Sequence, residues 1–149
     1  MKHIDYPPVW LVAFLIIAWV QGTYYPMGMS FGPVWAALLG GLLVGGGFLL
    51  MLLAVMEFFK YKTTLVPRRN SSAFLQTGIF KRTRNPIYLG DLMVLAGFIL
   101  YWDAPLSMPL IPIYLWILEK RFILGEEKHL RQTYRAQYAA YENKVRRWL

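Results

Sequence analysis

Apolar and polar residues follow one another along this chain in long blocks. Four apolar runs occupy residues 8–25, 34–58, 86–102 and 104–118, and two polar segments, 59–85 and 119–149, follow the second and the fourth run. A helix needs about 17–25 apolar residues to cross a bilayer, so the shorter runs lie near the lower limit. The pattern predicts an all-α, polytopic membrane protein with about four transmembrane helices.

The last polar segment has a helical period of its own. After Gly125, large side chains recur every three or four residues, at Leu130, Tyr134, Tyr138, Tyr141 and Val145. This spacing predicts one amphipathic C-terminal helix. Each polar segment is too short to bury a core alone, so we expect the two to fold against each other and to form the site of a single domain, residues 1–149.

Composition supports the membrane assignment, because 57% of the residues are hydrophobic. The chain nevertheless has a formal net charge of +8. Lys and Arg number one before the first run, seven in 59–85 and eight after the fourth run, with none in the other two connections. This distribution follows the positive-inside rule and predicts that both termini and segment 59–85 are cytoplasmic. Since the charge serves to orient the protein, we expect no nucleic-acid partner.

Metal and thiol chemistry have little support in the sequence. There is no cysteine, and the two histidines are His3 and His129. Disulfides are therefore excluded, and a structural zinc site, which is built from several Cys or His ligands, is not expected.

Glycines crowd the second run, at positions 40, 41, 45, 46 and 47. A phosphate-binding loop would need a preceding strand and a Lys-Ser/Thr pair, and the sequence has neither. Gly41 and Gly45 form instead the G-x-x-x-G pattern through which membrane helices approach closely. We interpret these glycines as helix-packing residues.

The third run begins with a helix-start signal. Asn85 can cap the helix, and Pro86 suits its first position, where a missing N–H costs nothing. The free N–H groups of such an end favour an anionic group of a ligand. Asp91, deeper in the run, is an intramembrane carboxylate. It is either a functional residue or a partner of Arg82 or Arg84 near the interface.

Two carboxylates, Glu126 and Glu127, open the predicted C-terminal helix. One interpretation is electrostatic, because the helix dipole stabilises acidic residues in a first turn. The alternative is that one carboxylate faces the helix start at 85–88 and binds a cationic or hydroxylated ligand. The helix start at 85–88 and the glutamate pair both border apolar runs. A site built from these two segments would therefore lie at the membrane surface, open to water on one side and to lipid on the other.

Four short motifs follow one another in the second half of the chain. They are Thr77-Gly-x-Phe80, Arg84-x-Pro-x-Tyr88, Glu126-Glu127-x-x-Leu130, and Tyr138-x-x-Tyr141 leading into Val145-Arg-Arg-Trp-Leu149. With these motifs, over residues 63–149, the chain resembles the isoprenylcysteine carboxyl methyltransferases and their phospholipid-methylating and short bacterial relatives, a family of integral membrane methyltransferases. The resemblance implies a protein of the bacterial inner membrane.

The resemblance also implies S-adenosylmethionine as cofactor, held outside any Rossmann domain. Carried over by position, its contacts are Phe74, Leu75, Phe80, Asn85, Pro86, Ile87, Tyr88 and Glu126. Aromatic and aliphatic side chains can enclose adenine, the helix start can receive the amino-acid carboxylate, and Glu126 can accept from the ammonium or the ribose hydroxyls. Methyl transfer then depends mainly on positioning.

The chain departs from the isoprenylcysteine enzymes at two positions. Asn85 replaces the usual histidine, so a carboxamide would make the contact of an imidazole. The arginine expected one turn before the glutamate pair is Phe122 here, and Arg121 lies one residue away. We expect Arg121 and Glu127 to orient the polar head of the acceptor, Arg121 for an anionic head and Glu127 for a cationic one.

The sequence therefore predicts methyl transfer to O, N or S of a lipophilic acceptor that reaches the site from the bilayer. Two alternatives stay open: a phospholipid or small-amine N-methyltransferase, and a catalytically silent membrane interaction protein of the same fold. Binding of S-adenosylmethionine separates the silent protein from both enzymes.

Overall fold

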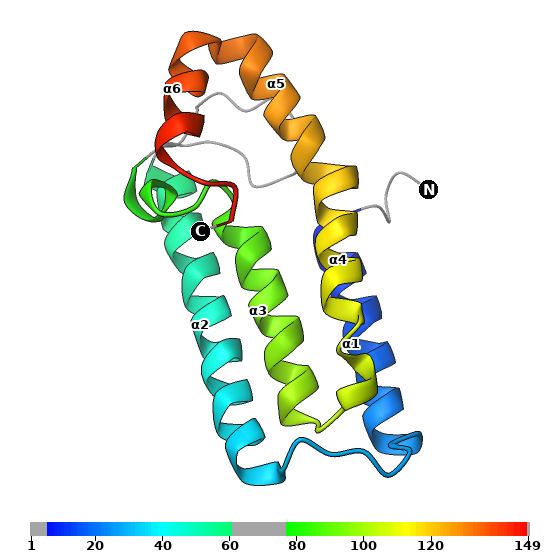
Figure 1. Cartoon of the computed structure of the whole chain (residues 1–149). Helices are drawn as coiled ribbons and strands as arrows, with labels where there is room; N and C mark the ends of the chain where they lie inside the picture. The colour runs from blue at the N-terminus through cyan, green and yellow to red at the C-terminus, as the bar shows by residue number, and fades with distance from the viewer. Residues whose placement is uncertain (1–5, 61–76, 149) are drawn as a thin grey trace.

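The computed structural model describes residues 6–60 and 77–148, and within these ranges every regular element is helical. Four helices run side by side, namely α1 (Pro7–Tyr24), α2 (Pro33–Lys60), α3 (Pro86–Tyr101) and α4 (Leu110–Leu118) (Figure 1). Two more, α5 (Leu124–Tyr134) and α6 (Ala136–Lys144), lie at one end of this bundle. The predicted all-α fold is confirmed for the described part of the chain.

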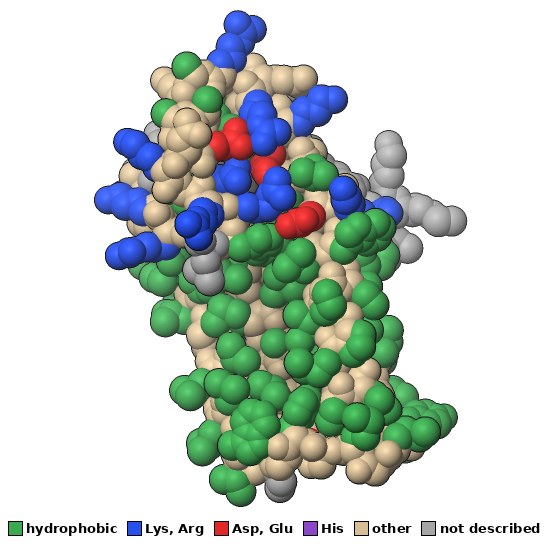
Figure 2. Space-filling model, in the orientation of Figure 1, with side chains coloured by type: hydrophobic (Ala, Val, Ile, Leu, Met, Phe, Trp, Pro, Cys, Tyr) green, Lys and Arg blue, Asp and Glu red, His purple; other side chains and the backbone are tan. Residues whose placement is uncertain are grey.

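The surface of the bundle is that of a membrane protein. α1 and α2 are each long and apolar enough to cross a membrane, and α3 is a shorter apolar helix. Exposed apolar side chains on α1 and α2 include Val12, Ile16, Leu38, Leu42 and Leu49. Figure 2 shows the charged side chains gathered at one end, above an apolar body. An exposed apolar surface of this extent is stable against lipid and unfavourable in water.

The fourth predicted helix, 104–118, begins later than expected. Pro105–Ser107 form a 3₁₀ turn, and the α-helix starts at Leu110. Ala104, which precedes Pro105, has a non-helical conformation, and neither Pro105 nor Pro109 has an N–H to donate. Regular α-helical hydrogen bonding therefore becomes possible only after these two prolines.

The predicted C-terminal amphipathic helix is in fact two helices: α5 begins before Gly125, at Leu124, and α6 begins at Ala136. α4 continues through a π-turn, Glu119–Ile123, into α5. The break falls at Arg135, whose φ of 43° and ψ of −110° end α5 and begin α6. Tyr138 and Val145 of the second half pack against Leu130 of the first. The apolar side chains of α5 and α6 therefore pack against each other. The three- to four-residue period continues through Arg135, so it could not show that the chain changes direction there.

Glycines bring α2 and α3 into close antiparallel contact. An added Cβ at Gly47 would come within 2.7 Å of the Gly90 carbonyl oxygen, and one at Gly97 within 2.6 Å of that of Gly40. A Cβ at position 41 or 45 would meet nothing within 4 Å. The predicted G-x-x-x-G contact is therefore wrong. The two helices approach at glycines seven residues apart in each helix, the spacing expected for helices whose axes cross at a small angle.

α1 joins the bundle through a core shared with α3 and α4. Phe14 and Tyr114 are buried there with their rings 5.4 Å apart, and Tyr114 Oη donates to Pro7 O at 3.0 Å. At the opposite end of the bundle, Asp103 accepts a hydrogen bond from Ser30 Oγ at 2.6 Å. These contacts fix the bundle at both ends and hold the helix starts of the charged end in place.

Candidate functional site

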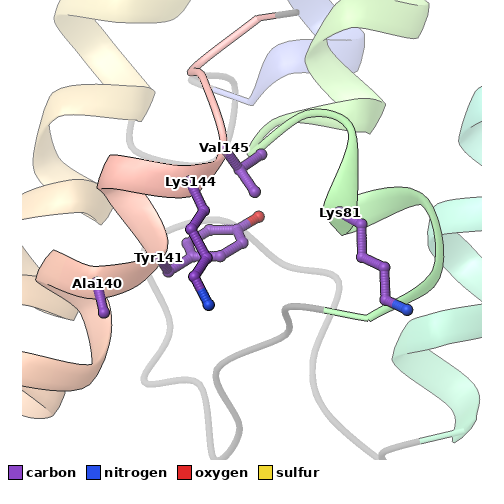
Figure 3. Close-up of a pocket in the computed structure, with 5 residues that line it drawn as sticks. All are labelled: Lys81, Ala140, Tyr141, Lys144 and Val145. Atoms are coloured by element: carbon purple, nitrogen blue, oxygen red, sulfur yellow. The ribbon is translucent and has the colours of Figure 1, made fainter.

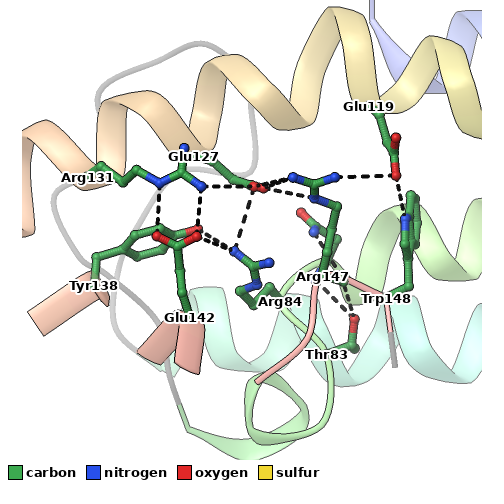
Figure 4. A network of polar contacts seen from close by, with 10 residues as sticks. Thr83, Arg84, Glu119, Glu127, Arg131, Tyr138, Glu142, Arg147 and Trp148 are labelled. Atoms are coloured by element: carbon green, nitrogen blue, oxygen red, sulfur yellow. Dashed lines mark hydrogen bonds and ion pairs between the residues drawn. The ribbon is translucent and has the colours of Figure 1, made fainter. Parts of the chain in front are cut away.

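Several segments distant in sequence meet at the charged end of the bundle (Figure 4). They are the turn 77–85, the start of α3, the rod formed by α4, the π-turn and α5, and the tail 145–148 that follows α6. The tail reaches the turn through a backbone hydrogen bond from Arg84 N to Arg146 O of 3.0 Å. The described parts of the two polar segments therefore lie against each other.

The start of α3 and the beginning of α5 touch at Tyr88 and Glu126. Tyr88 Oη donates to Glu126 Oε1 at 2.6 Å, and the buried Tyr88 ring stacks on Phe122 with 6.4 Å between ring centres. A hydrogen bond of this length to a carboxylate is charge-assisted and strong. Two of the predicted cofactor contacts, 38 positions apart, are thus brought together.

Glu126 and Glu127 do not occupy a helix N-terminus. Because the rod is continuous from Leu110, the N–H groups around the glutamates have acceptors within it, and the positive end of the dipole is remote. The helix-dipole interpretation is therefore wrong. The π-turn, closed by Leu124 N donating to Glu119 O, lies directly before the pair, and such turns are frequent at functional sites.

Asn85 occupies the N-cap position of α3 and Pro86 the first helical position, as predicted, but the Asn85 side chain does not cap the helix. Asn85 Nδ2 donates to Arg147 O at 3.0 Å, and Asn85 N donates to Thr83 Oγ1 at 3.2 Å. The predicted side-chain cap is wrong because the tail supplies a carbonyl acceptor for the amide. The first N–H groups of α3, like those of any α-helix, have no acceptor within the helix, and the Asn85 side chain does not supply one.

Glu127 is a buried carboxylate, 3% exposed, at the centre of an ion-pair network. Arg147 donates to it through Nε at 2.9 Å and Nη2 at 3.1 Å, and Arg84 Nη1 lies 3.6 Å from Glu127 Oε2. Two guanidinium groups therefore compensate the desolvated charge, as the burial of a carboxylate requires. The carboxylate expected to meet a cationic head thus already has cationic partners.

The network extends to Glu142 on α6 and to Glu119 in the π-turn. Arg131 donates to Glu142 at 2.8 and 2.9 Å, and Arg84 Nη1 donates to the same carboxylate at 3.1 Å. Hydrogen bonds from Arg131 hold the pKa of Glu142 below its usual range. At the other end of the network, Trp148 Nε1 donates to Glu119 Oε1 at 2.8 Å. These contacts join α5, α6, the turn and the tail (Figure 4).

Arg121 and Phe122 differ sharply in their surroundings. Phe122 is 1% exposed and packs beside Tyr88, so an aromatic ring fills the position at which the resemblance predicts an arginine. Arg121 is exposed, and its guanidinium carbon lies 5.6 Å from the ring centre of Trp10 on α1, a cation–π contact. Arg121 is therefore placed where α1 meets the rod.

Asp91 is buried, with 4% of its surface exposed, between α3 and α4. Its hydrogen-bond partner is Tyr114, whose Oη lies 3.4 Å from Asp91 Oδ2. The interpretation that Asp91 pairs with Arg82 or Arg84 is wrong, since Arg84 belongs to the glutamate network and Arg82 is exposed. With the bond from Tyr114 to Pro7 O, this contact links α3, α4 and the start of α1.

The other predicted cofactor contacts are apolar. Phe80 is buried and packs with Ala54, Phe58 and Ile87 on the inner side of the turn, and Pro86 is buried at the start of α3. Phe74 and Leu75 lie outside the described residues.

A pocket of about 330 Å³ opens between the turn and α6 (Figure 3). Its lining residues are Lys81, Ala140, Tyr141, Lys144 and Val145. None of these is a predicted cofactor contact, although Tyr141 Oη donates to Phe80 O at 2.7 Å. The pocket therefore adjoins the predicted site and is separate from it.

His129, near the site, has a buried ring nitrogen without a hydrogen-bond partner among the described residues. Its Nε2 is buried without a hydrogen bond in the described part of the chain, and it lies three residues after Glu126, on the same face of α5. An orphaned atom of this kind calls for a ligand or water as partner. Within residues 6–60 and 77–148, no group of three or more His, Asp or Glu side chains could hold a metal ion.

Reasoning from the sequence missed the residues that connect the site, namely Glu119, Glu142 and Arg147. Their hydrogen-bond partners lie 29, 58 and 20 positions away in the sequence, so the periodicity of a single helix could not predict these pairs. The motif that ends in Val145-Arg-Arg-Trp-Leu149 was the available signal, but it does not show which arginine turns inward. That choice depends on where the tail crosses the rod.

Comparison with known proteins finds a family match that includes both the start of α3 and the beginning of α5. Residues 35–137 match the phospholipid methyltransferase family. The protein-S-isoprenylcysteine O-methyltransferase of Saccharomyces cerevisiae is 32% identical over 78 residues, which is 52% of this chain and 33% of the yeast enzyme. The matched segment thus spans about a third of that relative's length. No solved structure matches the chain significantly.

Proposed function

Because this chain belongs to the phospholipid methyltransferase family, as its motifs predicted, we propose that it is an S-adenosylmethionine-dependent methyltransferase. Its acceptor is lipophilic and is methylated on O, N or S at the membrane surface. The observation that carries the proposal is the 2.6 Å hydrogen bond between Tyr88 and Glu126, since it joins the Arg-x-Pro-x-Tyr and Glu-Glu motifs in one site.

The proposed topology has four membrane spans with the charged end in the cytoplasm. α1 and α2 are long enough alone. α3, with 16 residues, is about 24 Å long, which suits a thin or locally adapted bilayer. α4 (9 residues) continues through the π-turn (5 residues), which gives a rod segment of about 21 Å, so the fourth span needs the same adaptation of the bilayer as α3. The positive-inside distribution then puts both termini in the cytoplasm.

The residues at this site fit the polar groups of S-adenosylmethionine. The first turn of α3 offers backbone N–H groups to a carboxylate, and Glu126 offers an acceptor to an ammonium or to ribose hydroxyls. The buried Nε2 of His129 needs a partner such as a hydroxyl. Phe80 and Ile87 supply the apolar surface for adenine, and Phe74 and Leu75 remain predicted contacts.

When bound, S-adenosylmethionine supplies a methyl group on a positively charged sulfur, and the chain has to orient the acceptor and exclude water. Tyr88 and Phe122 form a stacked aromatic wall beside Glu126. The hydroxyl of Tyr88 fixes the Glu126 carboxylate, so its orientation is set before a ligand arrives. Catalysis by this site is therefore catalysis by positioning.

The acceptor reaches the site from the bilayer, at the place where α1 meets the rod. Arg121 lies there, exposed and stacked on Trp10, and is proposed to orient an anionic head. Glu127 already has its charge compensated by two arginines, so its proposed role is to position its neighbour Glu126 and not to meet the head directly. One observation favours N-methylation of an amine as the second candidate: Phe122 fills the position of the arginine expected to bind a carboxylate.

Two measurements test the proposal. Calorimetric titration of the purified protein with S-adenosylmethionine should show saturable binding, and its absence would favour a silent interaction protein. Methyl transfer from labelled S-adenosylmethionine is then compared for carboxylate, thiol and amine heads, each with and without a prenyl or acyl chain. Equal methylation of chainless heads would refute access from the bilayer.

A further inference from the structure

The tail that follows α6 returns across the site and pairs with the turn before α3. Arg84 N donates to Arg146 O at 3.0 Å, and Thr83 Oγ1 donates to Arg147 O at 3.2 Å. The side-chain amide of Asn85 donates through Nδ2 to the same Arg147 carbonyl at 3.0 Å. The backbone of the tail is therefore bonded to the residues that lead into the helix start.

The side chains of the tail reach in the other direction, to the rod. Arg147 donates to Glu127 through Nε and Nη2, and its Nη1 lies 3.6 Å from Glu119 Oε1. Trp148 Nε1 donates to the same Glu119 oxygen at 2.8 Å. Figure 4 shows Arg147 between the rod and the turn. One residue thus holds the start of α3 with its carbonyl and the residue next to Glu126 with its guanidinium.

We propose that Arg147 is a positioning residue for the methyl-transfer site and that the tail 145–148 works as a latch between its two halves. The inference rests on the proposed function, because the halves are those assigned to S-adenosylmethionine. Asn85 and Glu126 belong to different elements, and the cofactor needs both at a fixed separation. Arg147 sets that separation without touching the cofactor, since its carbonyl and its guanidinium are already engaged.

The experiment compares Arg147→Gln with Arg146→Gln in the full-length protein. Both variants lose one positive charge and keep the backbone, but the Arg146 side chain is exposed. Calorimetric titration with S-adenosylmethionine should show an affinity about tenfold weaker for Arg147→Gln, because Asn85 and Glu126 are then no longer held at a fixed separation before the cofactor binds. Arg146→Gln should stay close to the wild type. The unfolding temperature of each protein without cofactor is measured in parallel.

Two further variants separate positioning from folding. Arg147→Gln leaves Glu127 with less compensation, whereas Arg147→Gln combined with Glu127→Gln removes both members of the pair and restores charge balance in the interior. The double variant should unfold near the wild-type temperature and still bind the cofactor weakly. Arg147→Lys, which keeps the charge but loses the two-pronged geometry, should restore part of the affinity.

The outcomes are distinct. Wild-type affinity in a folded double variant would overturn the latch while leaving the proposed function intact, and so would an equal loss of affinity in Arg146→Gln. A wild-type protein that does not bind S-adenosylmethionine would refute the proposed function and the latch together.

Discussion

Replacing Glu126 by Gln tests the centre of the proposed site with little disturbance of the fold. In the structure Glu126 Oε1 accepts the Tyr88 hydroxyl at 2.6 Å. A glutamine keeps an oxygen at that place, so the hydrogen bond to Tyr88 can survive in neutral form. What is lost is the negative charge offered to the ammonium or the ribose of the cofactor.

The expected effect follows from the strength of a charge-assisted hydrogen bond. Such a bond contributes about 1.5–3 kcal/mol, so the affinity for S-adenosylmethionine should fall about ten- to a hundredfold. The stability of the free protein should change by about 1 kcal/mol or less, because one neutral hydrogen bond replaces a charged one. Calorimetric titration gives the first quantity, and thermal unfolding in detergent gives the second.

Asp103→Asn is the matched control. Asp103 also accepts a hydroxyl at 2.6 Å, from Ser30, but at the opposite end of the bundle. The control should leave cofactor affinity unchanged. A folded Glu126→Gln protein with wild-type affinity would refute the reasoning and reduce the Tyr88–Glu126 bond to a structural contact.

Three further predictions concern topology, packing and pH. A cysteine at Met29 should react with an impermeant reagent outside intact cells, and one at Lys128 should not; the reverse pattern would contradict the cytoplasmic site. Gly97→Ala should destabilise the protein by about 1–3 kcal/mol in thermal unfolding, because the new Cβ would crowd a carbonyl oxygen on α2, whereas Gly41→Ala should not. The lowered pKa of Glu142 stabilises the fold above the ordinary glutamate pKa, and this stability is lost as the pH falls through the lowered value. Glu142→Gln should therefore weaken the dependence of the unfolding temperature on acid pH, and an unchanged profile would exclude that contribution.

The sequence alone determined the features that depend on local pattern. Long apolar runs identified the helices, because a spanning helix has to be apolar over its whole length. The order and spacing of the motifs identified the family, and they pointed correctly to Tyr88 and Glu126 as neighbours. Pro86 marked the start of α3 because proline is favoured at a first helical position.

The tertiary structure decided the features that depend on pairing between distant segments. Which glycines of α2 meet α3 follows from the relative rotation of the two helices, which the spacing within one helix does not contain. The reversal at Arg135 keeps the apolar stripe in phase, so periodicity could not show it. The inward turn of Arg147 toward a glutamate 20 positions away likewise requires the tail to be folded across the rod. Charged residues look alike in sequence, and only the packed structure selects the ones that are buried in pairs.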